Sequence, residues 1–329
     1  MSPTRAPIRA RGRAVTVRRQ RGVAMMVAIL LVAFGTILAA AIAFKSAMAA
    51  RRSTASMAMD QSLLIAEAAE ALAAYALRED KKAGGTVDHP GEEWSQPLGP
   101  VEVVPGIVLE AYLEDASGRF NLNSLVVNDQ VDPIALEKLE SLMQQVALET
   151  KWASLIADWI DPDTTPLQDG AEDSAYAAMD PPYRPPNTYI TSASELLALP
   201  GFGRERYLRL APYVTALPPD ASLNLCSAGG VLLDALVGPS HKDFGPDPKV
   251  LAKNRESGCF PEKTIYAAQF NGAGSPDWAK VSNRVSETSN YYRLTSIVTI
   301  GSAEFALYSL LERDGQNQIH VLMRSFTAD

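Results

Sequence analysis

An uncharged apolar segment runs from Val23 to Phe44 and is closed by Lys45. As a helix with a rise of about 1.5 Å per residue, a segment of this length crosses the roughly 30 Å hydrocarbon layer of a bilayer. The apolar part of a secretory signal peptide is usually shorter, about 7–15 residues, and ends at small residues. Alanines at 39–41 leave cleavage there as an alternative, but the length favours a membrane anchor that is kept.

The helical pattern continues beyond the apolar segment. Residues 45–77 contain no Pro or Gly and are rich in Ala, Met, Leu and Glu, which favour helix. A narrow apolar stripe recurs at helical spacing: Leu64, Ala68, Leu72 and Tyr75. We predict one helix from Val23 to Leu77, about 80 Å long. It should end before Asp80–Gly85, where charges and two glycines break it.

Alternation of apolar and polar residues predicts a small antiparallel sheet. Ile107–Glu114 has the pattern of a half-buried strand. A turn is predicted at Asp115–Gly118, and a second strand begins at Arg119–Leu122. Three more strands are predicted near the C-terminus, joined by short glycine-containing links that are typical of hairpins: Tyr292–Ile300, Ala303–Leu311 and Ile319–Phe326. The sheet is therefore assembled from two regions of the sequence that lie far apart.

The intervening segment is mainly helical by pattern, with Asp132 as an N-cap candidate before Pro133. Helices are predicted over Pro133–Glu149, Lys151–Ile160, Ser194–Leu199, Arg204–Ala211 and Gly229–Leu236. The simplest fold is α+β: a long N-terminal helix packed on a small antiparallel sheet, with a large α-helical domain inserted into the sheet. The expected segments are a basic leader (1–22), the transmembrane part of the helix (23–44), its external part (45–80), the first part of the sheet domain (81–125), the inserted domain (126–285) and the last strands (286–329).

The charge is divided unevenly along the chain. The net charge is −8, but residues 1–22 hold seven arginines and no acidic residue, which leaves 23 basic against 38 acidic residues, or −15, for the rest. The leading arginines outnumber Lys45, Arg51 and Arg52 on the other side of the apolar segment. The positive-inside bias therefore keeps the N-terminus in the cytoplasm and exports the body. An acidic body also argues against general nucleic-acid binding.

The two cysteines, Cys226 and Cys259, follow the membrane segment. Two cysteines cannot by themselves form a four-ligand zinc site. In an oxidising compartment they favour a disulfide, whereas in the cytosol they would be two unrelated thiols.

The strongest chemical signal is an acidic loop. Seven acidic residues fall within 23 positions, beside prolines and a glycine: Asp158, Asp161, Asp163, Asp169, Glu172, Asp173 and Asp180. Crowded carboxylates repel one another unless they are solvated or neutralised, and Ca²⁺ accepts about six to eight oxygens in flexible geometry. Four residues are candidates to converge on calcium, with carbonyl groups of residues 165–168 completing the shell: Asp161, Asp163, Glu172 and Asp173. The spacing is not that of an EF-hand, and a solvated acidic surface loop is the alternative.

Leu197–Gly203 is similar to the hairpin of helix-hairpin-helix modules, whose backbone amides meet phosphate, and three arginines follow it. The alternative is that Gly201 and Gly203 permit a tight turn between helices. The acidic surroundings and the expected export of the body favour the turn.

No catalytic constellation is visible in the sequence. The histidines His89, His241 and His320 are scattered, and the zinc-protease, phosphate-loop and nucleophile-elbow motifs are absent. Asp158 and Asp161 could act as a carboxylate pair, but nothing near them suggests a substrate pocket. We therefore expect a protein that is not an enzyme.

A basic leader that ends in glycine, a long apolar-to-amphipathic helix and a β-rich C-terminus resemble the plan of type IV pilin-like proteins. Arg21-Gly22 then looks like the site at which prepilin peptidase cuts on the cytoplasmic side. Such a cut would leave the apolar segment in place, with Val23 as the first mature residue.

Several motifs together resemble one family, the K-type minor pseudopilin of the type II secretion system. They follow one another along nearly the whole chain: Arg19–Gly22, Asp115–Leu125, Asp158–Asp163, Gly170–Asp173, Asp180–Tyr183, Ser194–Leu196, Tyr213–Leu217 and Tyr308–Leu311. The resemblance implies a pilin-like domain with a large α-helical insertion, a position at the pseudopilus tip and bound calcium. The family lacks the usual pilin glutamate at the fifth mature position, which here is Val27. Residues 224–227 depart from the family pattern, and 238–285 match little of it.

The resemblance predicts a non-enzymatic minor pseudopilin at the tip of the pseudopilus, which helps initiate its assembly and protein export across the outer membrane. The expected location is the inner membrane, crossed once, with the N-terminus cytoplasmic and the body periplasmic. The expected partners are prepilin peptidase, the I- and J-type minor pseudopilins and the pseudopilus shaft, without nucleic acid. The alternative function is a membrane-tethered nucleic-acid receptor that uses Leu197–Gly203.

Overall fold

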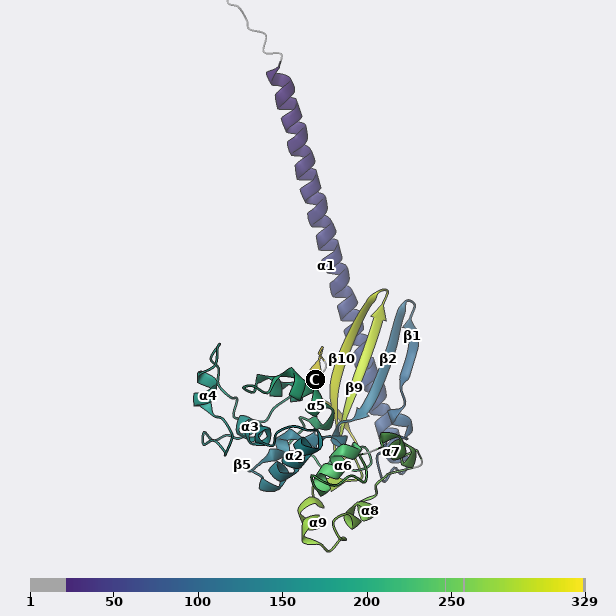
Figure 1. The fold of residues 1–329 in the computed structure, drawn as a ribbon. Coiled ribbons are helices and arrows are strands. Elements are labelled where there is room, and N and C mark those ends of the chain that lie inside the picture. Colours follow the sequence, from purple (N-terminus) through teal and green to yellow (C-terminus); the bar gives the residue numbers. More distant parts are fainter. Residues whose placement is uncertain (1–21, 246, 257, 328–329) are drawn as a thin grey trace, which may run out of the picture. The chain divides into compact units, whose positions relative to one another are not determined.

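The structure, a computed structural model, describes residues 22–245, 247–256 and 258–327. Contacts divide the chain into two units, Met1–Met59 and Asp60–Asp329. Helix α1 (Val23–Lys82) begins in the first unit and ends in the second (Figure 1). Within the described residues, α1 is the one helix that is long and apolar enough to cross a membrane.

Helix α1 is continuous, as the sequence predicts, but it ends at Lys82, slightly beyond the predicted end at Leu77. Charged residues in the last turn are compatible with helix, so Asp80 does not stop it. The helix ends where Gly84 adopts a φ of +98°, a conformation that favours glycine.

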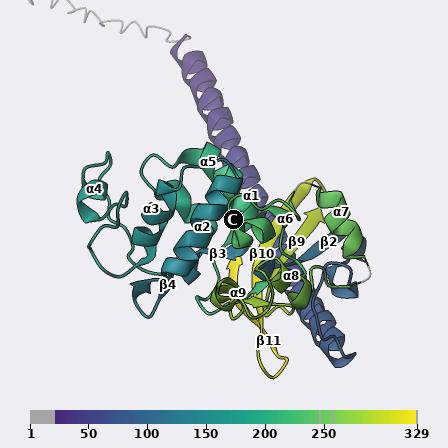
Figure 2. The ribbon, with the colours of Figure 1, turned by 60° about the horizontal axis from the view of Figure 1, so that its bottom comes forward.

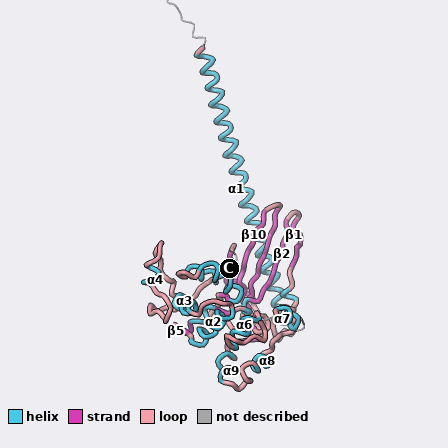
Figure 3. The backbone as a smooth tube through the Cα atoms, in the orientation of Figure 1, coloured by secondary structure: helices cyan, strands magenta, loops and turns pink. Residues whose placement is uncertain are grey.

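Five antiparallel strands form the main sheet, in the order β1-β2-β9-β10-β11. Figure 1 shows β1, β2, β9 and β10 side by side, and Figure 3 shows the same strands in magenta. The strands are β1 (Leu98–Val104), β2 (Ile107–Asp115), β9 (Tyr291–Ile300), β10 (Ala303–Arg313) and β11 (Ile319–Ser325). The pairing of β2 with β9 places Glu110 opposite Ile297. The prediction of a sheet built from two distant regions of sequence is therefore confirmed.

Two strands differ from the prediction. Strand β1 is an edge strand whose residues are nearly all exposed, so its sequence lacks the alternation that marks a strand, and it contains Pro100. The strand predicted at Arg119–Leu122 is reduced to β3 (Phe120–Asn121), which pairs in parallel with β6 (Val214–Thr215) outside the main sheet.

In the second unit, α1 covers one face of the sheet. The positions that α1 buries are mostly small: Ser62, Ala66, Ala69, Glu70, Ala73 and Leu77. They pack on Leu109, Val298 and Leu307 of three neighbouring strands. The apolar stripe predicted from the sequence, from Leu64 to Tyr75, is not on the side of α1 that packs on the sheet, and it is exposed. Helix α1 therefore has a second apolar side that the described chain leaves uncovered.

An ion pair between the buried carboxylate of Glu70 and the exposed guanidinium of Arg324 joins α1 to the far edge of the sheet. The guanidinium of Arg324 in β11 donates two hydrogen bonds to the carboxylate of Glu70, of 2.8 and 2.7 Å. The Ser309 hydroxyl in β10 donates a third, of 2.6 Å. Glu70 can therefore be buried on a mainly apolar helix side, since its oxygens are satisfied.

Residues 116–290, between β2 and β9, form the insertion, seen from another side in Figure 2. Its α-helices are α2 (Pro133–Gln145), α3 (Lys151–Ile160), α4 (Asp173–Ala177), α5 (Gly203–Leu210), α6 (Gly230–Val237), α7 (Pro248–Asn254), α8 (Lys263–Ala268) and α9 (Pro276–Val281). Its short strands are β3, β6, β4 (Val126–Val127), β5 (Gln130–Val131), β7 (Leu223–Asn224) and β8 (Val285–Ser286). Helical turns of the 3₁₀ type lie at η1 (Glu93–Ser95), before β1, and at η2 (Ala116–Gly118), η3 (Leu122–Leu125), η4 (Ala193–Ala198) and η5 (Ala211–Tyr213).

The insertion has its own apolar core, to which α2, α3, α5 and α6 contribute. The helices predicted from the pattern are present, although the one at Ser194–Leu199 is the 3₁₀ turn η4. Helices α7, α8 and α9 were not predicted, because each has only six or seven residues, too few to show a helical period.

A buried polar network lies where α1, the sheet and the insertion meet. The Arg313 guanidinium donates to both carboxylate oxygens of Asp88, at 2.7 and 2.6 Å, and the Tyr292 hydroxyl donates at 2.9 Å. From the insertion, the amide of Asn224 donates to the Asp88 carbonyl (2.7 Å) and to the Asp115 carboxylate (2.8 Å). One set of buried hydrogen bonds therefore ties together the loop after α1, the ends of three strands and the insertion.

This network predicts a large loss of stability when one charge is removed. Arg313→Met should lower the free energy of unfolding by about 3–5 kcal/mol, because Asp88 would stay buried without its cation. Lys280→Met is the matched control, since it removes one member of the exposed Lys280–Asp277 pair (2.9 Å). Its effect on the free energy of unfolding should be far smaller, because solvent screens exposed pairs. Denaturant unfolding of the full chain in detergent measures both, and equal losses would contradict the assignment.

Candidate metal centre

The acidic loop predicted from the sequence brings three carboxylates together. Helix α3 ends at Ile160, and the loop then leads to α4. Asp161 (2% exposed), Glu172 (5% exposed) and the exposed Asp163 each place a carboxylate oxygen within 4.8 Å of the other two. Two of the three are therefore buried beside like charges, which is unfavourable unless a cation or protons neutralise them.

The two buried carboxylates have oxygens without a hydrogen-bond partner among the described residues. Oδ1 of Asp161 and both carboxylate oxygens of Glu172 are buried without a hydrogen bond. Burial, followed by repulsion from Asp163, raises the pKa of Asp161 to about 6. Burial, followed by repulsion from Asp158 and Asp161, raises the pKa of Glu172 to about 7. A set of unpartnered anionic oxygens fits a hard divalent cation such as Ca²⁺.

Asn187 also belongs to this site, although it was not among the ligands predicted from the sequence. Its Nδ2 donates to the backbone carbonyl of Asp163 (2.7 Å), and its Oδ1 is buried without a partner. A neutral amide oxygen is an ordinary calcium ligand. The sequence signal was weak, because Asn187 lies far along the chain in a proline-rich segment.

Asp173, the fourth predicted ligand, lies outside this group of carboxylates. It begins α4, and its carboxylate faces the exposed guanidinium of Arg184 at 3.6 Å. Asp158 is also separate, although it is fully buried one helical turn before Asp161. Burial raises the pKa of Asp158 to about 6, against the lowering effect of a backbone N–H from Leu167.

A second group of acidic residues, Asp80, Asp88 and Glu92, meets the same distance test. Its electrostatic situation is different, because the Arg313 guanidinium is bonded to both oxygens of Asp88. The Glu92 carboxylate also accepts from the Trp94 indole N–H (2.7 Å). Here the protein supplies its own cation, so the group in the acidic loop fits a metal better.

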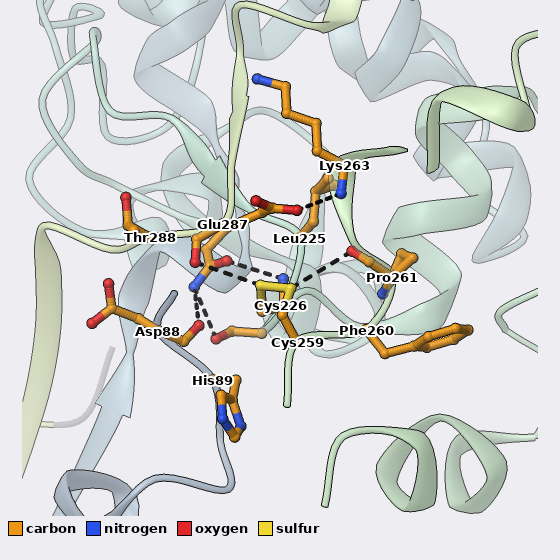
Figure 4. The surroundings of a disulfide bond; sticks show 12 residues. Asp88, His89, Leu225, Cys226, Cys259, Phe260, Pro261, Lys263, Glu287 and Thr288 are labelled. Atoms are coloured by element: carbon orange, nitrogen blue, oxygen red, sulfur yellow. Dashed lines mark hydrogen bonds between the residues drawn. A yellow bond between two sulfur atoms is a disulfide. The ribbon is translucent and has the colours of Figure 1, made fainter. Parts of the chain in front are cut away.

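Cys226 and Cys259 are joined by a disulfide, with their Cα atoms 4.6 Å apart (Figure 4). The bond links the segment before α6 to the loop between α7 and α8. Next to it, the buried Arg255 guanidinium donates to the carbonyls of Leu225 (2.8 Å), Ala228 (2.7 Å) and Phe260 (2.7 Å). The disulfide and this arginine together hold the part of the insertion that the sequence left without a predicted structure.

The glycine-rich hairpin at Leu197–Gly203 is a packed turn between η4 and α5. Gly201 and Gly203 both have a φ of +73°, which favours glycine. Phe202 is buried edge-to-face on Trp152, with ring centroids 5.4 Å apart. Arg206 lies over the same Trp152 ring and donates to the Gly201 carbonyl at 3.0 Å. The turn thus has a structural role in the insertion, and nothing in it favours nucleic-acid binding.

The predicted processing and tip residues lie at the start of α1. Gly22 forms a turn, Val23 is the first helical residue, and Val27 is exposed on the helix. The leader residues 1–21, including Arg19 and Arg21, lie outside the described residues.

Comparisons with known proteins agree with the fold and the motifs. A family model described as type II secretion system protein K matches residues 118–219. Type II secretion system protein K of Pseudomonas aeruginosa is 33% identical over 319 residues, which cover 93% of each chain. The protein of the same name from Pectobacterium carotovorum is 30% identical and covers 94% of this chain and 97% of its own.

A solved structure shares the fold as well as the sequence. It is a chain in the crystal structure of the GspK-GspI-GspJ complex from the type 2 secretion system of enterotoxigenic Escherichia coli. The likeness has a TM-score of 0.71 and 26% identity, and covers 84% of this chain and all of the other. The chain described here belongs to the type II secretion system protein K family.

Proposed function

We propose that this chain is a non-enzymatic minor pseudopilin that forms the tip of a type II secretion pseudopilus and helps initiate its assembly. The observation that carries the proposal is similarity over nearly the whole chain, 93% of it for the relative from Pseudomonas aeruginosa. It covers the apolar helix, the sheet and the insertion together, rather than one domain. No catalytic activity is proposed, since the sequence has no catalytic motif and the polar groups of the acidic loop fit an ion.

The partners are the I- and J-type minor pseudopilins, and α1 offers a surface for them. Its exposed stripe includes Leu64, Leu72 and Tyr75, which the second unit leaves uncovered. Beside this stripe lies an apolar groove of about 170 Å³, lined by Ala69 and Ala73 of α1 and by Trp94 and Leu98 next to the sheet. Small residues along a groove allow a second helix to approach closely. An apolar helix from a neighbouring pseudopilin fits this surface.

The tip position is supported by Val27 and by the insertion. In pilin-like proteins, glutamate at the fifth mature position pairs with the terminal amine of the subunit ahead. A subunit with nothing ahead would keep that carboxylate unpaired in the membrane, which costs roughly 2.5–3.5 kcal/mol. Valine avoids this cost. The insertion joins the sheet at the end where α1 finishes, through Asn224, Asp88 and Asp115, and would obstruct a further subunit there.

Membrane insertion and processing follow from the same helix. The apolar part of α1 anchors the protein in the inner membrane, the arginine-rich leader keeps the N-terminus cytoplasmic, and the body is periplasmic. Prepilin peptidase cuts between Gly22 and Val23 and leaves the anchor attached. The mass of the chain extracted from membranes reports this cut, and an intact Met1 would contradict it.

Calcium is the ion proposed for the acidic loop. Asp161, Asp163 and Glu172 supply charge, and Asn187 supplies a neutral oxygen, which together suit a hard cation of flexible coordination. The bound ion would neutralise the buried carboxylates and so hold the loop between α3 and α4 in place. Its role is structural.

Beyond processing, the first prediction from this proposal concerns the partner surface. Leu72→Glu, on the exposed stripe (47% exposed), should reduce co-purification with the I- and J-type pseudopilins at least tenfold, because a carboxylate would be desolvated against an apolar helix. Val250→Glu is the matched control, since Val250 is equally apolar and exposed (54%) but lies on α7. Full retention of both partners by Leu72→Glu would remove this surface from the interface.

The second prediction concerns calcium. Binding to the native state should raise stability by about 2.7 kcal/mol at a hundredfold excess over Kd. Chelation should therefore lower Tm, and Asp161→Asn should abolish the response. Asp173→Asn is the control, since Asp173 lies in the same segment but outside the carboxylate group. A wild-type Tm that does not respond to calcium would contradict the proposal.

The calcium response should also depend on pH. The pKa values of Asp161, about 6, and Glu172, about 7, are raised in the ion-free fold. Protonation therefore stabilises the ion-free protein as the pH falls through this range, and an ion must displace those protons. The fall in Tm on chelation should be larger at pH 8 than at pH 5.5. A response of equal size at both values would argue against these ligands.

The third prediction concerns the disulfide, which fits a periplasmic body. Protein purified from the membrane and unfolded without reductant should take up no thiol-alkylating reagent at Cys226 or Cys259. After reduction, both cysteines should be labelled. Labelling of both before reduction would contradict the bond and remove its support for an oxidising compartment.

A further inference from the structure

The acidic loop surrounds one carboxylate that does not belong to the cluster of Asp161, Asp163 and Glu172. Asp158, in the last turn of α3, is fully buried, at 0% exposed. Both of its oxygens accept from the backbone N–H of Leu167, at 3.2 and 3.1 Å. The lone pairs of Asp158 are thus directed at the loop backbone.

Gly170 is the point of closest approach between the loop and this carboxylate. A Cβ at position 170 would lie 1.9 Å from Oδ2 of Asp158 and 2.7 Å from its Cγ. Real Cβ atoms do not come this close, so any other residue at 170 must displace either the loop or Asp158. The neighbouring Asp169 has a φ of +67°, so the chain turns sharply just before this contact.

The contact decides where Glu172 lies. Asp161 directly follows α3, whereas Glu172 comes after the whole loop. The two side chains meet only if the loop returns to the end of α3. The returning part is bonded to Asp158 through the backbone N–H of Leu167 and lies closest to it at Gly170. We infer that Asp158 is a positioning residue, which, with Gly170, folds the acidic loop so that Asp161, Asp163 and Glu172 can share one cation.

This inference rests on the proposed calcium site but assigns Asp158 a role other than ligand. A ligand would direct its lone pairs at the ion, whereas both Asp158 oxygens accept from the backbone N–H of Leu167. Residues that orient metal ligands without touching the metal typically change metal affinity about 10- to 100-fold when they are mutated. Loss of a direct ligand such as Asp161 should be more severe.

The test compares three variants of the full chain by Tb³⁺ luminescence. Tb³⁺ takes the oxygen ligands of Ca²⁺ and is sensitised by aromatic rings, and Trp159 and Tyr176 lie near this loop with ring centroids 5.3 Å apart. Displacement of Tb³⁺ by Ca²⁺ gives the affinity for Ca²⁺. Gly170→Ala and Asp158→Asn should each weaken binding about 10- to 100-fold. Gly229→Ala should leave it unchanged, because a Cβ there meets nothing within 4 Å.

Hydrogen exchange of the ion-free proteins separates positioning from ligation. Positioning predicts that Asp158→Asn speeds exchange of the Leu167 amide even without metal. Complete loss of Tb³⁺ binding with unchanged exchange at this amide would make Asp158 a ligand and overturn the inference, as would wild-type affinity in both variants. If Gly170→Ala fails to fold, Asp158→Asn carries the same test. Absence of Tb³⁺ and Ca²⁺ binding by the wild type would instead refute the calcium proposal.

Discussion

The buried pair of Asp88 and Arg313 is the constraint on which the second unit depends. Asp88 lies in the loop that follows α1, Arg313 ends β10, and Asn224 of the insertion donates to the backbone of Asp88. The three parts of the unit are far apart in sequence, and each brings a polar group that cannot be left unsatisfied in the interior. The insertion is therefore fixed to the sheet through specific hydrogen bonds as well as through apolar contact. A protein at the end of a filament needs such a rigid junction if its insertion is to hold a defined position.

Two groups of crowded carboxylates lie among the described residues, and their charge is balanced in different ways. Around Asp88 the chain supplies a guanidinium, so the charge is balanced within the fold. In the acidic loop, Oδ1 of Asp161 and both carboxylate oxygens of Glu172 have no hydrogen-bond partner among the described residues. The same physical cost, burial of like charges, is therefore met once by an internal cation and once, as we propose, by calcium. The first group makes the junction independent of calcium, whereas the second makes the loop after α3 responsive to it.

The sequence was sufficient to predict those features that have a repeating apolar pattern or a recognisable motif. The length of α1, the hairpins of β9, β10 and β11, and the helices at 133–160 follow from repeating apolar positions, and the structure has them. Strand β1 and helices α7–α9 are too exposed or too short to show a period. In the site, Asp161, Asp163 and Glu172 were predicted because they are close in sequence. Asn187 and the close contact between Asp158 and Gly170 were not predicted, because only the folded loop brings these residues together. Likewise, composition marks the stripe from Leu64 to Tyr75 as apolar, but it cannot tell which side of α1 meets the sheet.

The central claim is that one copy of this chain ends a pseudopilus and contacts its neighbours through α1. A photo-crosslinking residue placed at Leu72 or Tyr75, on the exposed side of the helix, tests it in assembled filaments. If this chain lies at the tip, adducts should form with the I- and J-type minor pseudopilins and none between two copies of this chain. Ladders of self-crosslinked copies would instead place the chain in the shaft and contradict the tip position.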